Sequence, residues 1–108
     1  MSAPLTTKQI AYLRGLGQRL EPTVHIGQAG LTDALLASLN QALDNQELVK
    51  VKFHAHKEEK KQLAPQLAER SSSVLVQRVG HVVLLYRPQA DPAKRKIQVP
   101  AHDRPPGV

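Results

Sequence analysis

The sequence predicts an α/β fold, a two-layer sandwich in which helices cover a four-stranded mixed sheet. Apolar residues recur at helical spacing within residues 6–19, 32–45 and 57–70. Runs rich in β-branched residues at 23–26, 48–54, 74–79 and 82–86 predict strands. The resulting order is α-β-α-β-α-β-β. Helices that connect strands must cross over, and right-handed crossovers place them on one face of the sheet.

The first helix is expected to begin at Thr6 or Thr7, either of which can cap it, and to run to about Arg19. Its inward-facing apolar residues are Ile10, Leu13, Leu16 and Leu20. Gly15 and Gly17 each weaken a helix by up to about 1 kcal/mol relative to alanine. Close packing of this helix against a neighbouring element is the interpretation we prefer for these glycines.

A glycine-bounded loop lies between the first strand and the second helix, which begins at Leu31 or Thr32 and ends near Asn45. The loop residues are Gly27, Gln28, Ala29 and Gly30. Glycine lets a ligand approach the backbone, and the unpaired N–H groups of a helix start favour phosphate. The pattern alone is weak because a tight strand-to-helix turn also explains it. Asp33 in the first helical turn would compete with a phosphate there.

The remaining elements follow from alternation and turn signals. In the strand at 48–54, valine and phenylalanine alternate with Lys50, Lys52 and His54, which gives a basic polar face or an ordinary solvated one. Pro65 predicts a kink or a late start for the helix at 57–70. Gly80 and His81 predict a hairpin between the last two strands. The final strand is apolar on both faces, as expected of a central strand.

Composition limits the class of protein. At 108 residues the chain is expected to form one domain at 1–88, followed by a Pro-rich basic extension at 89–108, mostly extended or disordered. The basic run at 94–96 within that extension is more simply a solvated charge cluster than a site. The net charge of +6 favours polyanionic partners. There is no cysteine, no apolar run near the roughly 20 residues of a membrane span, and no signal-peptide pattern within residues 1–20. We therefore expect a cytoplasmic protein without membrane contact.

Several stretches together resemble one family. They are Leu-Thr-Thr-Lys-Gln at 5–9, Gly-Gln-Ala-Gly-Leu-Thr-Asp at 27–33, Glu-Leu-Val-Lys-Val-Lys at 47–52, Val-Gln-Arg-Val-Gly at 76–80, the Leu-Tyr-Arg-Pro region at 84–88 and Arg-Lys-Ile-Gln-Val-Pro at 95–100. In order and spacing the chain resembles the CRM domain (chloroplast RNA splicing and ribosome maturation), in particular its single-domain bacterial YhbY-like members.

The resemblance implies an RNA-binding protein that associates with precursors of the large ribosomal subunit. It also implies a fold similar to the C-terminal domain of bacterial translation initiation factor three. The family's Gly-x-x-Gly loop, likened to that of KH domains, corresponds to residues 27–30. Two departures stand out. Gln28 and Ala29 occupy positions where many members carry a basic residue, and serines at 71–73 replace the usual glycine after the third helix.

Binding is expected to combine the loop, which would hold phosphates through backbone N–H groups, with a salt-dependent contribution from surface cations. The candidate cations are Lys8, Arg14, Lys50, Lys52, Arg78 and Arg87. Only three residues are aromatic, Tyr12, Phe53 and Tyr86, so base stacking should be minor. These features predict recognition of structured RNA by shape and backbone.

Other functions have less support. The sequence shows no nucleophile beside a base, no paired carboxylates and no Walker pattern, so we predict neither enzymatic activity nor a small-molecule substrate or cofactor. His54 and His56, with His25 nearby, fall short of the three or four ligands of a zinc site, and no metal is expected. The main alternative is a basic DNA-binding or protein-adaptor module. We expect a monomer.

Overall fold

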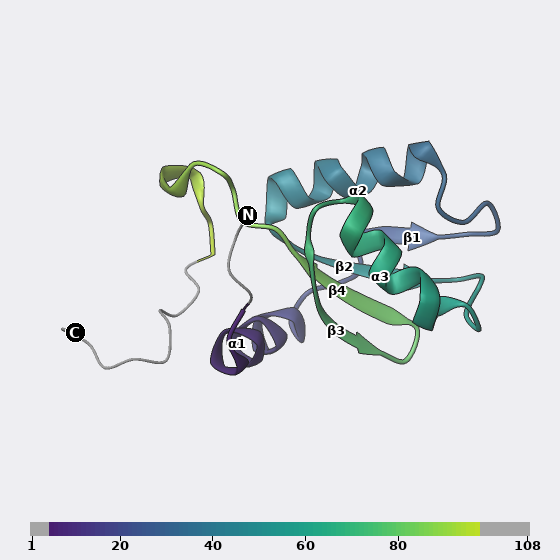
Figure 1. Cartoon of the computed structure of the whole chain (residues 1–108), viewed down its shortest axis with the longest axis horizontal. Coiled ribbons are helices and arrows are strands. Elements are labelled where there is room, and N and C mark those ends of the chain that lie inside the picture. The colour runs from purple at the N-terminus through teal and green to yellow at the C-terminus, as the bar shows by residue number, and fades with distance from the viewer. Residues whose placement is uncertain (1–4, 98–108) are drawn as a thin grey trace.

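The computed structural model describes residues 5–97 (Figure 1). Within this range the helices are α1 (Thr7–Gly17), α2 (Asp33–Gln46) and α3 (Lys60–Arg70). The strands are β1 (Val24–Ile26), β2 (Leu48–Phe53), β3 (Val74–Val79) and β4 (Val82–Tyr86), and a short 3₁₀ turn, η1 (Pro92–Lys94), follows them. The predicted order α-β-α-β-α-β-β is confirmed.

The four strands form one mixed sheet in the order β1-β2-β4-β3. β1 and β2 are parallel, whereas β4 is antiparallel to both β2 and β3. β4 is therefore a central strand, as its uniformly apolar sequence predicts. The two connecting helices, α2 and α3, pack on the same face of the sheet (Figure 1), which confirms the predicted sandwich.

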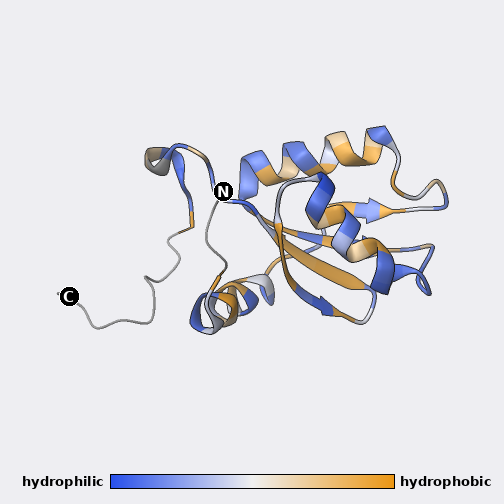
Figure 2. Cartoon of the chain, viewed as in Figure 1, coloured by the Kyte–Doolittle hydropathy of each residue, from blue (hydrophilic) through white to orange (hydrophobic). Residues whose placement is uncertain are grey.

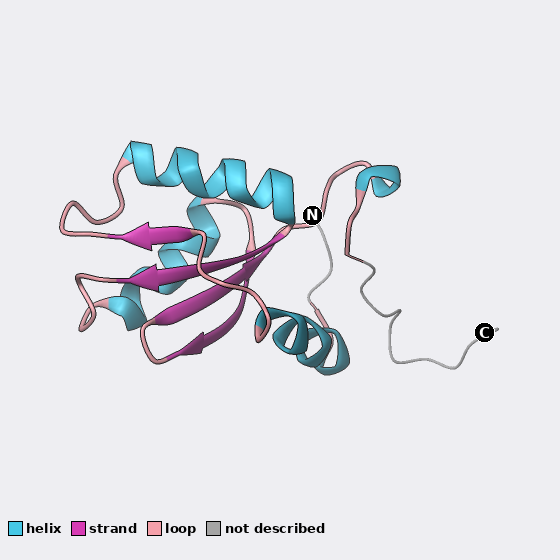
Figure 3. Ribbon diagram, turned by 180° about the vertical axis from the view of Figure 1, so that it is seen from behind, coloured by secondary structure: helices cyan, strands magenta, loops and turns pink. Residues whose placement is uncertain are grey.

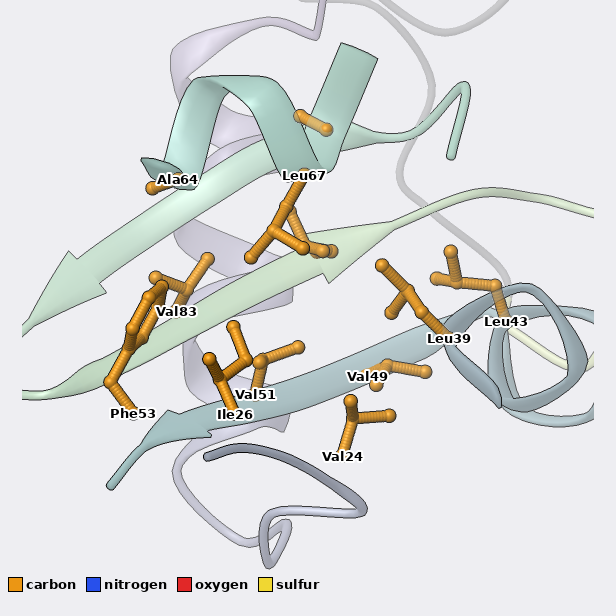
Figure 4. Packing of buried hydrophobic residues seen from close by; sticks show 12 residues of the cluster. Val24, Ile26, Leu39, Leu43, Val49, Val51, Phe53, Ala64, Leu67 and Val83 are labelled. Atoms are coloured by element: carbon orange, nitrogen blue, oxygen red, sulfur yellow. The ribbon is translucent and has the colours of Figure 1, made fainter. Parts of the chain in front are cut away.

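The main core lies between the sheet and α2 and α3. Figure 4 shows its buried side chains, among them Phe53 and Val83 from the strands and Leu39 and Leu67 from the helices. Aliphatic residues fill almost all of this core, as the low aromatic content requires. Along β2 and β4, every second side chain points into it.

The opposite face of the sheet is partly covered by α1, which the sequence did not place. A second cluster forms there around Leu13 of α1 and Leu84 and Tyr86 of β4. Figures 2 and 3 show α1 beside the strands, at the end of the sheet away from the β1–α2 connection. This packing explains why β4 is apolar on both faces.

Gly17 is the closest point of approach between α1 and the sheet. A Cβ at this position would lie 2.5 Å from Cδ2 of Leu84. Close packing is therefore confirmed as the reason for Gly17. It is not the reason for Gly15, where a Cβ would meet nothing within 4 Å.

The helix ends differ slightly from the expected positions. Thr6 caps α1, in a capping box with Gln9, and the helix ends at Gly17 rather than near Arg19. α3 begins late, at Lys60, which is one of the two outcomes that Pro65 predicts. After α3, Ser72 adopts φ +54°, so a serine occupies the left-handed position usually held by glycine.

Residues 88–97 return to the domain through Glu47, which is fully buried. Its carboxylate accepts hydrogen bonds from the backbone N–H groups of Gln89 (2.8 Å), Lys96 (2.6 Å) and Ile97 (2.8 Å). The expected extension from residue 89 is thus bonded to the domain over its first nine residues. Residues 98–108 lie outside the described part of the chain. The division at residue 88 stays a prediction.

Candidate nucleic-acid interface

Three connections meet at one end of the sheet. β1 and β2 are parallel and both end there, while the turn from β3 to β4 returns at the same end (Figure 1). The connections are residues 27–32, residues 54–59 and the hairpin at 80–81, and together we call them the loop end. Backbone hydrogen bonds join them, from His54 N–H to Ile26 O (2.9 Å) and from Phe53 N–H to His81 O (2.8 Å).

The Gly-x-x-Gly segment forms a tight, exposed turn. Gly30 N–H donates to Gly27 O (3.1 Å), and Gly30 needs its glycine because its φ is +73°. The N–H groups of Gln28 and Ala29 form no hydrogen bond with any described residue. Thr32 then caps α2 by accepting from Leu35 N–H (3.1 Å). The turn therefore presents two unpaired donors beside a helix start.

The imidazole of His56 is hydrogen-bonded to the backbone of this turn. Its Nε2 lies 2.8 Å from Gln28 O, and because a carbonyl can only accept, Nε2 carries the proton. A trans peptide bond is planar, so the N–H of Ala29 points away from the Gln28 carbonyl and away from the imidazole. His56 itself has φ +55°, an uncommon conformation for a side-chain-bearing residue. The hydrogen bond from His56 to Gln28 O therefore fixes the direction of the Ala29 N–H, one of the two unpaired donors.

Cations from three elements converge at the hairpin. Partial desolvation and the neighbouring charges of Lys60, Lys57 and Lys52 lower the pKa of His81. The three lysines come from the start of α3, the connection before it and β2. Lysines from three elements therefore lie near enough to the His81 imidazole to act on its charge.

The structure brings some of the predicted site residues to the loop end. They are the turn at 27–30, Lys52, and Arg78, which lies one residue before the end of β3. Lys50 lies further along β2, and its Nζ donates to Leu20 O (2.8 Å). Lys8 and Arg14 are exposed on α1, which covers the half of the sheet face remote from the loop end.

Arg87 lies at the opposite end of the sheet from the loop end, where its guanidinium is bonded within the fold, and its assignment to the RNA contacts stays a prediction. Its guanidinium donates to the Asn40 side chain, to Ser71 O (both 2.7 Å) and to Asn40 O (3.0 Å), and it pairs with Asp44 at 2.7 Å. These bonds join α2, the end of α3 and β4. With four of its five N–H donors used inside the molecule and its position remote from the loop end, we do not include Arg87 in the candidate interface.

Sequence reasoning missed four residues of the loop end: His56, Lys57, Lys60 and His81. Each lies in or beside a connection, where neither helical nor strand periodicity gives information. The strand directions carry the missing signal, because only they show that the three connections share one end. Carboxylates also lie there, with Asp33 in the first turn of α2 and Glu58 and Glu59 before α3. They moderate the positive potential.

The three histidines considered as metal ligands, His25, His54 and His56, do not all come together. His25 Nδ1 and His54 Nε2 are 2.8 Å apart, whereas His56 turns to Gln28. Among residues 5–97, no three potential metal-binding side chains come together. In the same range, no helix is long and apolar enough to cross a membrane.

Comparison with known proteins adds the deciding observation. The sequence profile of the CRS1/YhbY (CRM) domain matches residues 5–87. This chain belongs to the CRM domain family. The match spans every helix from α1 to α3 and all four strands, so the resemblance seen in the sequence is confirmed.

Named relatives of this CRM protein are similarly small. An RNA-binding protein of Haemophilus influenzae is 40% identical over 97 residues, 89% of this chain and 95% of that protein. A probable RNA-binding protein of Pseudomonas aeruginosa is 36% identical, over 83% of this chain and 88% of its own. The solution structure of a candidate RNA-binding protein from Staphylococcus aureus superimposes with a TM-score of 0.74 at 34% identity. It covers 90% of this chain and 100% of its own.

Proposed function

We propose that this CRM-domain protein binds structured RNA through its loop end. Its target is a precursor of the large-subunit ribosomal RNA, as the family resemblance implies, which would place it in the cytoplasm. One observation carries the proposal: the two unpaired N–H donors of the turn at 27–30 lie at the same end of the sheet as Lys52, Lys57 and Lys60, whose charges act on His81. The names of its relatives as RNA-binding proteins support the same activity.

Binding combines a short-range and a long-range component. A backbone phosphate sits on the turn, accepts from Gln28 and Ala29 N–H, and gains from the positive end of the α2 dipole. Lys52, Lys57 and Lys60 neutralise neighbouring phosphates and release counterions. Phosphate contacts position an RNA without reading its sequence, so recognition depends on the shape of the folded RNA.

The proposal is tested by the salt dependence of affinity for a folded fragment of large-subunit ribosomal RNA. Replacing Lys52, Lys57 or Lys60 singly with glutamine should reduce the slope of log affinity against log salt by roughly one unit. Arg14→Gln is the matched control: the sequence also suggests Arg14 as an RNA contact, but it is an exposed cation on α1, away from the loop end to which this proposal assigns binding. Its slope should equal that of the wild type.

Other outcomes would contradict the proposal in distinct ways. Equal losses for Arg14→Gln and the lysine variants would mean diffuse attraction instead of a defined interface. Tighter binding to duplex DNA than to structured RNA at equal salt would favour the DNA-binding alternative. RNA binding without any salt-dependent slope would favour a protein adaptor.

His56 should matter for affinity because it sets the direction of the Ala29 N–H. His56→Phe keeps a ring beside Gly30 but removes the donor to Gln28 O, and we expect an affinity loss of roughly three- to tenfold. His56→Gln keeps an N–H donor at similar reach and should recover most of that loss. Both variants retain a Cβ at φ +55°, so backbone strain is matched. Equal affinities for the two variants would show that the hydrogen bond does not orient the turn.

A further inference from the structure

The face of the sheet that α1 leaves open has an ordered pattern of side chains across three strands. In the pairing register, Lys52 of β2, Val82 of β4 and Val79 of β3 form one row next to the loop end. Lys50, Leu84 and Gln77 form the next row. Each row is cationic on β2 and apolar on β4. Adjacent strands are about 4.8 Å apart, so the lysines are about 10 Å from the β3 residues.

A hollow lies over these rows, between the end of α1 and the hairpin. Leu84 forms part of its floor. Because Gly17 has no Cβ, α1 packs directly on Leu84 and forms one side of the hollow. Val79 is 58% exposed at its outer edge, unusual for a valine in a strand. No acidic residue lines the hollow.

Two amide groups border the hollow without a partner. The side chains of Gln18 and Gln77 line it, and neither forms a hydrogen bond with any described residue. An amide offers both a donor and an acceptor. The hollow thus combines an apolar floor, two side-chain amides that can bond to the polar edge of a flat ring, and Lys50 on one side. Lys52 follows Lys50 on the same face of β2, one row nearer the loop end.

We propose that this hollow binds one unpaired nucleobase of the RNA held at the loop end. The base lies on Val79, Val82 and Leu84, its edge meets the amides of Gln18 and Gln77, and its phosphate faces Lys52. The inference rests on the proposed function and extends it, because it adds a preference for RNA with an unpaired nucleotide beside the contacted helix. The amide contacts would add readout of the base, which phosphate contacts cannot supply.

The second hollow near the turn fits this role less well. It lies between the turn and α3, where Ala29, His56 and Gln62 line it together with the carboxylate of Glu59, and where Arg70 is the one cation of the lining that is charged at neutral pH. A carboxylate inside the site would repel the phosphate that accompanies a base. The hollow on the open sheet face has no acidic residue in its lining and includes Lys50 instead.

A tryptophan reporter tests the proposal, because the chain contains no tryptophan. Val79→Trp places an indole at the edge of the hollow, on an exposed position that tolerates a larger side chain. Val74→Trp is the matched control, since Val74 is also exposed on β3 but at the far end of the strand. The probes are a ribosomal RNA hairpin with an unpaired loop and a fully paired RNA duplex, with binding followed separately by fluorescence anisotropy of labelled RNA.

In the Val79→Trp variant, stacking of a base on the new indole should quench its emission when the hairpin binds. Affinity for the hairpin should rise by about fivefold or more, because bases stack on aromatic rings more strongly than on a valine. The emission of the Val74→Trp variant should not change, and the duplex should bind Val79→Trp without quenching it. In a further variant, Gln77→Ala, affinity for the hairpin should fall by about threefold or more while affinity for the duplex stays the same.

The outcomes separate this inference from the proposed function. If the hairpin binds with the expected salt dependence but quenches Val79→Trp no more than Val74→Trp, the base site is wrong and the loop-end interface stands. Equal quenching of Val79→Trp by hairpin and duplex would also overturn the base site. If neither RNA binds, the proposed function fails, and the base site fails with it.

Discussion

Gly27→Asp should lower the affinity for structured ribosomal RNA by roughly 10- to 100-fold at moderate salt, the largest effect on binding that we expect from one substitution. The carboxylate would stand where the phosphate binds, so it would repel the ligand and cover the N–H groups of Gln28 and Ala29. A hydrogen bond to a charged group contributes about 1.5–3 kcal/mol, and the loss of one contact accounts for a change of this size.

The fold should survive this substitution, which makes the result interpretable. A Cβ at Gly27 would meet nothing within 4 Å, and Gly27 is not among the glycines with positive φ. Gly15→Asp is the matched control, because Gly15 is an exposed glycine with equally open surroundings, on α1. Affinity would be measured by titration of labelled RNA, and folding by circular dichroism. If Gly27→Asp binds as tightly as Gly15→Asp, the turn is only structural and the lysines carry the binding.

The fold was predictable because its elements have strong local signals. Alternation in β2, the Gly80-His81 turn and the apolar runs of β3 and β4 specify strands whatever surrounds them. Apolar residues on both faces of β4 also predicted its central position. The face to which α1 belongs was not predictable, because periodicity shows which side of a helix is buried but not against which surface. The surface against which α1 packs becomes clear only from the close approach of Gly17 to Leu84 in the structure.

The candidate site was predictable only in part, and the differences between the predicted residues and the structure share a cause. A basic residue in a sequence gives no sign of whether its charge faces solvent or a partner within the fold. Arg87 was predicted to contact RNA and is bonded to Asn40 and Asp44, whereas Lys57 and Lys60 were not among the predicted contacts and lie at or beside the loop end. Only the strand directions, which depend on long-range pairing, distinguish these cases.

The sequence likewise gives no sign that the acidic residue Glu47 is buried and bonded within the fold. Of the substitutions we consider, its replacement should have the largest effect on stability. Glu47→Gln should lower the free energy of unfolding by about 2–4 kcal/mol, because the buried carboxylate accepts three backbone hydrogen bonds and an amide has one oxygen for them. Its NH₂ group would also face an N–H donor. Urea unfolding at neutral pH measures the difference, with Glu58→Gln, an exposed glutamate, as the control.

The same carboxylate should make residues 89–97 sensitive to acid. Burial tends to raise the pKa of Glu47, but the N–H groups of Gln89, Ile97 and Lys96, helped by the charge of Arg95, outweigh burial and lower it below the ordinary value of 4.5. A group whose pKa is lowered in the folded state stabilises the fold above its ordinary pKa, and this contribution is lost as the pH falls through the lowered value. The wild type should therefore lose stability below about pH 4.5, in addition to the effect of its other carboxylates.

Glu47→Gln should lack this component, so its stability should fall less steeply than that of the wild type over the same acid range. Amide hydrogen exchange gives the local measurement. In the wild type, the N–H groups of Gln89, Lys96 and Ile97 should be protected at neutral pH and should exchange faster in acid after correction for intrinsic rates. In Glu47→Gln they should exchange fast throughout. Protection of all three in the variant would mean that other contacts, such as Arg95 with Gln89 O, hold the segment.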